Sequence, residues 1–150
     1  MILIAHRGNI NGPVPYKENS PEYLVEALSK GYYVEVDVWK IGEDIYLGHD
    51  KPEYPINISF LKSNSNFICH AKTPETLELL LKHNLHCFSH DKDECVLTSK
   101  GFIWTYPGKS LTDTSICVMP EWDNPELNNV FISKCYGVCS DWVSKIDTTL

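Results

Sequence analysis

The sequence predicts an α/β protein, a reduced TIM-like (β/α) barrel of about seven parallel strands plus an inserted hairpin strand. A helix-start pattern recurs along the chain, and each copy follows an apolar run that is typical of a buried strand. Strands that are separated by helices or long loops usually pair in parallel. These two observations together favour the barrel.

The recurring helix start consists of a capping residue, a proline and a glutamate in succession. Its copies are NSPEYLVEALSKG, KTPETLELLLKHN and DNPELNNVFI, with Ser20, Thr73 and Asn124 as expected N-cap residues. Apolar residues at helical spacing follow in the first two copies, whereas the third has a weaker apolar face. The buried strands that precede them are predicted over residues 2–6, 67–71 and 116–119.

Further predicted strands are YYVEVDVW, HCFSH, GFIWTY and YGVCSDW, and DIYLGH is expected to form a hairpin with the first of these around Gly42. A complete eight-unit barrel usually needs about 200 residues or more, whereas this chain has 150. The stretch from 87 to 120 leaves little room for helices. We therefore expect a barrel with one thin side, which a second copy of the chain, in a homodimer, is suited to cover.

Length and composition favour a single domain over residues 1–150. The net charge is −7, which disfavours nucleic acid and anionic membranes as partners because both attract basic surfaces. No apolar run has the length of a membrane span, and we expect no signal peptide. The sequence has no CxxC pair, and Cys69, Cys87, Cys117 and Cys139 lie in apolar runs, so buried thiols in a cytoplasmic protein are expected.

Polar residues occupy the carboxyl ends of the predicted strands, the edge where parallel α/β folds carry their sites. They are His6, Glu35, Asp37, His49, Asp50, His70, Lys72, His90, Asp91, Tyr106, Glu121 and Asp141. So many histidines and carboxylates at one edge are hard to attribute to chance. The sequence therefore predicts a functional site there.

Glu35 and Asp37 are two residues apart in VEVDVW, so both carboxylates leave the same face of one strand. Two like charges so close together need a counter-ion, and Mg²⁺ and Ca²⁺ prefer oxygen ligands. The alternative is a solvated polar face on an edge strand. The alternating valines around the two carboxylates favour the metal.

His6 and His49 are candidates for an acid–base pair because imidazole titrates near neutral pH. A structural role in the core is the usual alternative for a lone histidine. Arg7 and Lys72 are cations at strand ends, suited to phosphate oxygens or, alternatively, to ion pairs with nearby acids. Together with the carboxylates these residues indicate metal-assisted phosphoryl chemistry.

Four short motifs follow one another between residues 5 and 50: HRG in AHRGN, ENS in KENSPEYLVEAL, E-x-D in GYYVEVDVW and HD in DIYLGHD. In this order they resemble the opening of the glycerophosphodiester phosphodiesterase family, within the phospholipase-C-like phosphodiesterase superfamily. YGVCSDW resembles the last strand of that family, and residues 85–135 have no detailed match. The resemblance implies a TIM barrel with the hairpin inserted after the second strand.

The resemblance also implies roles for particular residues. His6 and His49 correspond to the acid–base pair and Arg7 to the phosphate-contacting arginine. Glu35 and Asp37 correspond to two metal ligands. The residues that lie beside the phosphate in the family correspond here to Glu18 and Asn19.

The third predicted strand departs from the family pattern. The family has Glu-x-Lys there, and this chain has His70 and Lys72 in ICHAK. A neutral imidazole in place of a third carboxylate lowers the ligand charge by one and shifts the preference towards Mn²⁺ or Zn²⁺, or it weakens the metal site. The chain is also short for the family, so a shallow site with little selectivity for the alcohol group is expected.

The expected function is therefore metal-dependent hydrolysis of a glycerophosphodiester or a similar small phosphodiester, as in lipid metabolism. One alternative is a catalytically weak or inactive barrel that binds a phosphorylated small molecule, and another is lyase or isomerase chemistry at the same edge. The sequence leaves open whether His90, Tyr106 or Glu121 joins the site. Trp104, Tyr106 and Trp122 are candidates for a substrate wall, with core packing as the alternative.

Overall fold

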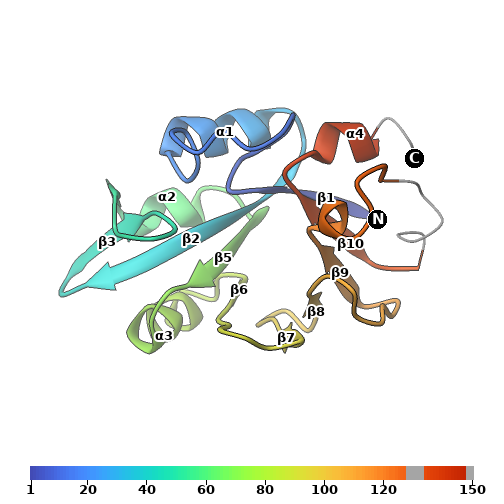
Figure 1. Cartoon of the computed structure of the whole chain (residues 1–150). Coiled ribbons are helices and arrows are strands. Elements are labelled where there is room, and N and C mark those ends of the chain that lie inside the picture. The colour runs from blue at the N-terminus through green and yellow to red at the C-terminus, as the bar shows by residue number, and fades with distance from the viewer. Residues whose placement is uncertain (128–133, 148–150) are drawn as a thin grey trace.

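The computed structural model describes residues 1–127 and 134–147 (Figure 1). Within these residues the strands are β1 (Ile2–His6), β2 (Tyr33–Ile41), β3 (Asp44–Leu47), β4 (Tyr54–Ile56), β5 (Phe67–Ala71), β6 (Cys87–Phe88), β7 (Cys95–Leu97), β8 (Ile103–Thr105), β9 (Ser115–Val118) and β10 (Gly137–Ser140). The helices are α1 (Pro21–Ser29), α2 (Ile58–Lys62), α3 (Pro74–Lys82), the 3₁₀ helix η1 (Pro120–Trp122) and α4 (Val143–Asp147).

All of these strands belong to one sheet. Its main path runs β4-β3-β2-β1-β10-β9-β8-β7, while β5 lies beside β2 and β6 beside β5. The pairs from β6 through β5, β2, β1, β10 and β9 to β8 are parallel, and the pairs of β3 and β4 and of β7 with β8 are antiparallel, as is the β2–β3 hairpin. Figure 1 shows the resulting curl, in which β6 at one end of the sheet and β7 at the other end do not pair with each other.

The predicted reduced TIM-like (β/α) barrel is therefore wrong. The molecule is a curled half-barrel with a mixed sheet and few helices. The physical reason lies in residues 89–119, where the structure contains no helix. A parallel crossover needs about a dozen residues or more, and the five residues between β7 and β8 allow only an antiparallel return.

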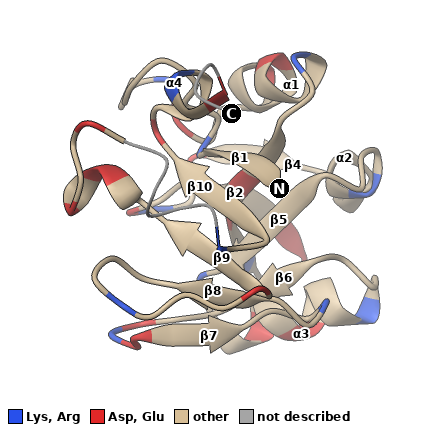
Figure 2. Cartoon of the chain, turned by 90° about the vertical axis from the view of Figure 1, so that its right-hand side faces the viewer, with Lys and Arg blue, Asp and Glu red and all other residues tan. Residues whose placement is uncertain are grey.

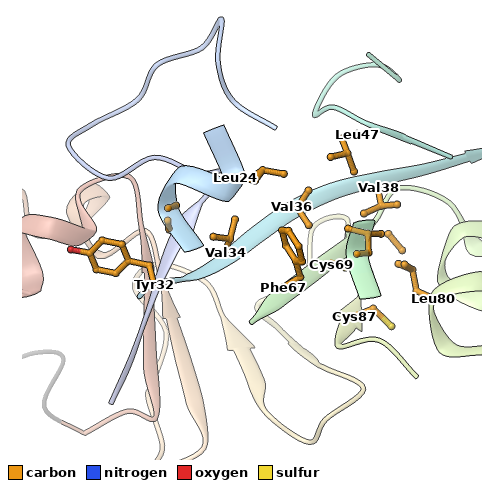
Figure 3. Packing of buried hydrophobic residues seen from close by; sticks show 14 of the residues in the cluster. Leu24, Tyr32, Val34, Val36, Val38, Leu47, Phe67, Cys69, Leu80 and Cys87 are labelled. Carbon is orange, nitrogen blue, oxygen red and sulfur yellow. The ribbon is translucent and has the colours of Figure 1, made fainter. Parts of the chain in front are cut away.

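The long strand β2 separates the core from the site. Val34, Val36 and Val38 point to one side, where they pack with Leu24 of α1 and Leu80 of α3 (Figure 3). Because side chains alternate along a strand, the acidic residues between these valines point to the other side, towards the inside of the curl. The alternation thus places an apolar layer under the helices and a polar group within the sheet.

A second apolar cluster fills the inside of the curl. It includes Ile4 of β1, Ile68 of β5 and Trp104 of β8. Two residues further along these strands are His6, His70 and Tyr106, which line a cavity at the carboxyl ends of the strands. The inner apolar cluster therefore packs directly beneath the residues that line the cavity.

The helix starts behave differently from one another. The copies at Ser20 and Thr73 begin α1 and α3. The copy at Asn124 is followed by a turn over residues 125–126, and the rest of it, residues 128–133, lies outside the described residues. The expected third helix is thus not found in the part of that segment that can be described.

Charge is distributed without a basic face in the view of Figure 2, where basic positions are scattered over helices and loops. Among the described residues, no helix has the length and apolar character needed to cross a membrane. Cys69, Cys87, Cys117 and Cys139 are buried thiols.

Candidate functional site

A cavity of about 710 Å³ opens at the carboxyl ends of the parallel strands. Of the residues to which the sequence assigns a catalytic, phosphate-binding or metal-binding role, those that line it are His6, Arg7, Glu18, Asn19, Glu35, Asp37, His49 and His70. Lys72 lines an adjoining pocket of about 220 Å³ that shares His49 and His70 with it. Residues as far apart in the sequence as His6 and Lys72 therefore meet in one region.

Glu35, Asp37 and His70 form a buried cluster that can hold a metal ion. Each offers one ligand atom, and these atoms lie within 4.8 Å of one another. Strand register explains the grouping, because His70 of β5 is the partner of Asp37 of β2. His6 of β1 is likewise the register partner of Glu35.

Asp37 is surrounded by donors. Its Oδ1 accepts hydrogen bonds from His70 Nδ1 at 2.9 Å and from Lys72 Nζ at 3.3 Å. Arg7 Nε lies 3.3 Å from Oδ2. Burial alone would raise the pKa of Asp37, but the hydrogen bond from His70 and the charges of Lys72 and Arg7 hold this pKa well below its usual range. Asp37 is therefore an ionised carboxylate.

Glu35 differs from Asp37 in having few hydrogen-bond donors near its carboxylate. Its carboxylate accepts a long hydrogen bond of 3.3 Å from the Arg7 backbone N–H, and the nearest imidazole nitrogens, of His6 and His70, are 3.9 and 4.0 Å away. Burial and then repulsion by Asp37 raise the pKa of Glu35. A buried, weakly partnered carboxylate beside a second one fits a cation, because an ion would remove both causes of this shift.

Asn19 and Glu18 hold the charged residues in place. Asn19 Nδ2 donates to Asp37 Oδ2 and the Asp37 N–H donates to Asn19 Oδ1, both at 2.9 Å. Glu18 accepts from Arg7 Nη1 at 3.1 Å and from Asn9 Nδ2 at 2.9 Å. The ENS motif thus fixes the orientation of Asp37 and Arg7.

Two of these residues have left-handed backbone conformations, with φ 53° at Arg7 and 63° at Asn19. Such conformations are uncommon outside glycine and are often found at functional sites. Gly8 follows with φ 89°, and a Cβ atom there would lie 2.9 Å from Tyr23. The HRG motif therefore needs glycine for both its backbone conformation and its packing.

His6 is held by a carboxylate from the far end of the chain. Its Nδ1 lies 2.7 Å from Asp141 Oδ1, just after β10. Burial lowers the pKa of His6, but the hydrogen bond to Asp141 and the charge of Glu35 outweigh this effect, so the pKa is above its ordinary value. Because the same bond holds the pKa of Asp141 down, Asp141 is the acceptor and His6 Nδ1 the donor, which leaves Nε2 for proton transfer.

His49 lies after β3 and is more exposed than His6, with 41% of its side chain accessible. Its Nδ1 is 2.7 Å from Asp50 Oδ1. Each of the two predicted catalytic histidines therefore has a carboxylate on Nδ1, an arrangement that fixes the ring orientation. The difference is that the partner of His6 is partly buried while Asp50 is exposed.

Asp141 and Asn9 are site residues to which sequence reasoning assigned no role. Asn9 Nδ2 donates to Asp141 Oδ1 at 2.8 Å as well as to Glu18. Asp141 stood among the strand-end residues, so its position was a usable signal, whereas Asn9 carried none beyond its place after HRG. Glu121 lies one step further out, since its Oε1 accepts from the Asp141 N–H and from Ser140 Oγ, each at 2.9 Å.

His90 and Tyr106 also reach the cavity. The His90 ring stacks on the His70 ring with centroids 4.7 Å apart, and the Tyr106 ring lies 4.6 Å from His90. Burial, followed by the charge of His70, lowers the pKa of His90. Through these ring contacts, the aromatic part of the cavity lining lies directly beside the cluster of Glu35, Asp37 and His70.

Comparison of the chain with models of known protein families, with curated proteins and with solved structures finds no match. The functional interpretation therefore depends on the residues and the geometry described above.

Proposed function

We propose that this protein is a metal-dependent phosphodiester hydrolase that acts on a glycerophosphodiester or a similar small phosphodiester. The observation that carries the proposal is the meeting, in one cavity, of a carboxylate–histidine cluster, a histidine held by a carboxylate, and an arginine. Residues of all four motifs that resemble the glycerophosphodiester phosphodiesterase family line this cavity. Their convergence supports membership of that family.

Glu35, Asp37 and His70 are the residues that would hold the ion. Two carboxylates favour Mg²⁺ or Ca²⁺, and the imidazole adds Mn²⁺ and Zn²⁺ as candidates. When bound, a divalent ion neutralises phosphate charge and polarises a coordinated oxygen.

In the proposed reaction the oxygen of water attacks phosphorus and the bond to the leaving alcohol oxygen breaks; alternatively a neighbouring hydroxyl of the substrate attacks first, and water then opens the cyclic diester. One histidine of the pair, His6 or His49, takes the proton of the nucleophile, and the other gives a proton to the leaving oxygen. The hydrogen bond to Asp141 keeps His6 Nε2 available for this transfer. Arg7 stabilises negative charge on the phosphoryl oxygens, and Lys72 adds positive charge beside Asp37.

A second candidate is a protein that binds a phosphorylated small molecule without consuming it. The observation that favours it is the crowding of Asp37, which already contacts Lys72, Arg7 and His70. These positive groups partly replace the charge of a divalent ion and are able to hold a phosphate themselves.

The test uses the purified protein with Mg²⁺, Ca²⁺ or Mn²⁺ and two substrates, bis-p-nitrophenyl phosphate and glycerophosphocholine. We expect metal-dependent product release that a chelator abolishes, and a loss of about 100-fold or more in His6→Ala. His83→Ala is the matched control, because His83 caps the C-terminus of α3 and does not line the cavity. Absence of product with every metal would overturn the hydrolase, and calorimetric binding of glycerol phosphate without turnover would favour the second candidate.

A homodimer and a cytoplasmic location are part of the proposal. Strand β7 ends the path of the sheet, and its Leu97 is 70% exposed, so a second copy has an apolar edge to cover. Light scattering at increasing concentration tests the dimer, with Leu97→Lys expected to weaken it. The buried thiols of Cys69, Cys87, Cys117 and Cys139 fit a reducing compartment.

A further inference from the structure

Part of the cavity lining is aromatic and has no role in the proposed reaction. Phe88, Trp104 and Tyr106 belong to it. The Phe88 and Trp104 rings stack with centroids 4.5 Å apart, and both residues are 3% exposed. These rings are fixed by the inner core, so they form a rigid surface next to the ionic cluster.

Trp122 differs from these buried rings. It also lines the cavity, yet 67% of it is exposed. The chain turns at Met119, which has a left-handed φ of 47°, and the short helix η1 then presents the indole. A large apolar ring that is exposed beside a cavity leaves a face available for a ligand.

Tyr106 carries a polar atom that the described residues do not satisfy. Its Oη is buried and has no acceptor for its proton among them, and the Trp104 indole N–H, which acts on this oxygen, is itself a donor. Burial, followed by the charge of Glu35, raises the pKa of Tyr106, so the phenol stays protonated and is a hydrogen-bond donor. An unsatisfied buried donor costs free energy, which an acceptor on a bound ligand would recover.

The size of the cavity points in the same direction. Its volume of about 710 Å³ is within the range of sites for drug-sized molecules. A glycerol group contains only six heavy atoms and would leave most of the aromatic surface in water. A planar ring would cover it, because aromatic side chains recognise flat rings by stacking.

We propose that the phosphoester ligand of this cavity carries a planar, nucleoside-like ring, which stacks on Trp122 and accepts a hydrogen bond from Tyr106 Oη. The inference rests on the proposed function in one respect, that the phosphate group lies near Arg7 and the carboxylate–histidine cluster. It makes the aromatic lining the part of the site that selects the alcohol.

The test measures equilibrium binding by calorimetry, which needs no turnover. The ligands are adenosine 5′-monophosphate, glycerol 3-phosphate and hexyl phosphate, each with Mg²⁺ present. We expect the nucleotide to bind about tenfold or more tightly than the other two, as stacking of one base provides. Trp122→Ala should remove most of this advantage and Trp122→Phe should restore part of it.

Two further variants sharpen the result. Tyr106→Phe keeps the ring but removes the donor, so it should weaken the nucleotide and leave glycerol 3-phosphate unchanged. Tyr16→Ala is the matched control, because Tyr16 is a 79% exposed aromatic residue that does not line the cavity. Its affinities should equal those of the unaltered protein.

The outcomes separate this inference from the proposed reaction. Four results would each overturn the planar-ring inference. They are equal affinity for the nucleotide and glycerol 3-phosphate, equal affinity for the nucleotide and hexyl phosphate, no binding of any ligand, and an unchanged nucleotide preference in Trp122→Ala. If the protein prefers the nucleotide but hydrolyses no diester, the stacking of a planar ring on Trp122 is supported and the proposed hydrolase activity is rejected. If the protein hydrolyses glycerophosphodiesters but does not prefer the nucleotide, the hydrolase is supported and the planar-ring inference is rejected.

Discussion

The carboxylates of Glu35 and Asp37 leave one strand two residues apart, but their surroundings push their pKa values in opposite directions. Asp37 has cationic partners on both oxygens, and its pKa is lowered. Glu35 is buried beside Asp37, and its pKa is raised. Asp37 therefore adds stability above its unfolded pKa that is lost as the pH falls through the folded value. Glu35 stabilises the native state only at low pH, and this contribution is lost as the pH rises through its raised pKa.

Replacing Glu35 should reveal the loss of stability that its buried charge causes at neutral pH. At pH 7 the metal-free Glu35→Gln variant should melt about 2–4 °C above the unaltered protein, because glutamine has no charge to bury, and the gain should vanish near pH 4. Added Ca²⁺ or Mg²⁺ should raise the melting temperature of the unaltered protein but not that of the variant.

Differential scanning calorimetry over pH 4–8 checks this prediction. Glu43→Gln is the control, because Glu43 is exposed on the β2–β3 turn and its replacement should change nothing. A lower melting temperature for Glu35→Gln at pH 7 would contradict the electrostatic account.

The Asp141–His6 pair provides a second prediction at this scale. In Asp141→Asn the pKa of His6 should fall, because the hydrogen bond and charge of Asp141 raise it. The pH profile of the proposed activity should shift to lower pH with it, and the rate should drop about 100-fold.

Nuclear magnetic resonance titration of the imidazole signals gives the pKa directly, even for an inactive protein. Asp147→Asn serves as control, since Asp147 accepts a hydrogen bond from Tyr32 outside the cavity. An unchanged His6 titration in Asp141→Asn would show that the pair does not act as described.

At the scale of elements, two helices start with the same sequence phrase but are capped differently. Thr73 Oγ1 accepts a hydrogen bond from the Thr76 N–H at 3.2 Å, whereas Ser20 makes no side-chain cap. Thr76 Oγ1 in turn accepts from the Lys40 N–H at 2.8 Å. The α3 cap is therefore linked to β2, the strand that carries the carboxylates.

Alanine at the two N-cap positions should separate these cases. Thr73→Ala should lower the free energy of unfolding by about 1 kcal/mol, while Ser20→Ala should stay within about 0.5 kcal/mol of the unaltered protein. Urea titration followed by circular dichroism measures both. Equal losses would mean that the observed cap bond contributes nothing.

The elements that sequence reasoning missed are short and depend on their neighbours. Strands β4 and β7 have three residues each, too few for a periodic pattern, and they form because β3 and β8 offer an edge for pairing. Helices α2 and α4 have five residues each. The long patterns, such as VEVDVW and the first two helix starts, were predictable because period and capping agree within the segment itself.

For the whole molecule, the pairing of β1 with β10 joins the two ends of the described chain. Together with the pairing of β10 with β9 it makes the sheet continuous from β2 to β8. It also brings Asp141 to His6 across 135 positions. The contact between His6 and Asp141 therefore depends on the pairing of β1 with β10.

Gly137 tests this pairing. A Cβ atom at this position would lie 2.5 Å from Ile2 Cγ1 and 3.0 Å from Ile2 O, so Gly137→Ala should push β10 from β1 and cost about 1–3 kcal/mol. Unfolding should remain one transition, coincident by circular dichroism and tryptophan fluorescence. Separate transitions by the two probes would contradict the single domain.

The sequence by itself determined local features of this protein: the strand that carries Glu35 and Asp37 on one face, the HRG turn and the starts of α1 and α3. These features follow from local periodicity and backbone preference, which a segment of ten residues can express. Tertiary structure alone decided that the sheet remains a mixed half-barrel, that Asp141 orients His6, and that Asp37 is ionised while the pKa of Glu35 is raised. Those outcomes depend on strand order and burial, which arise only when distant segments pack together.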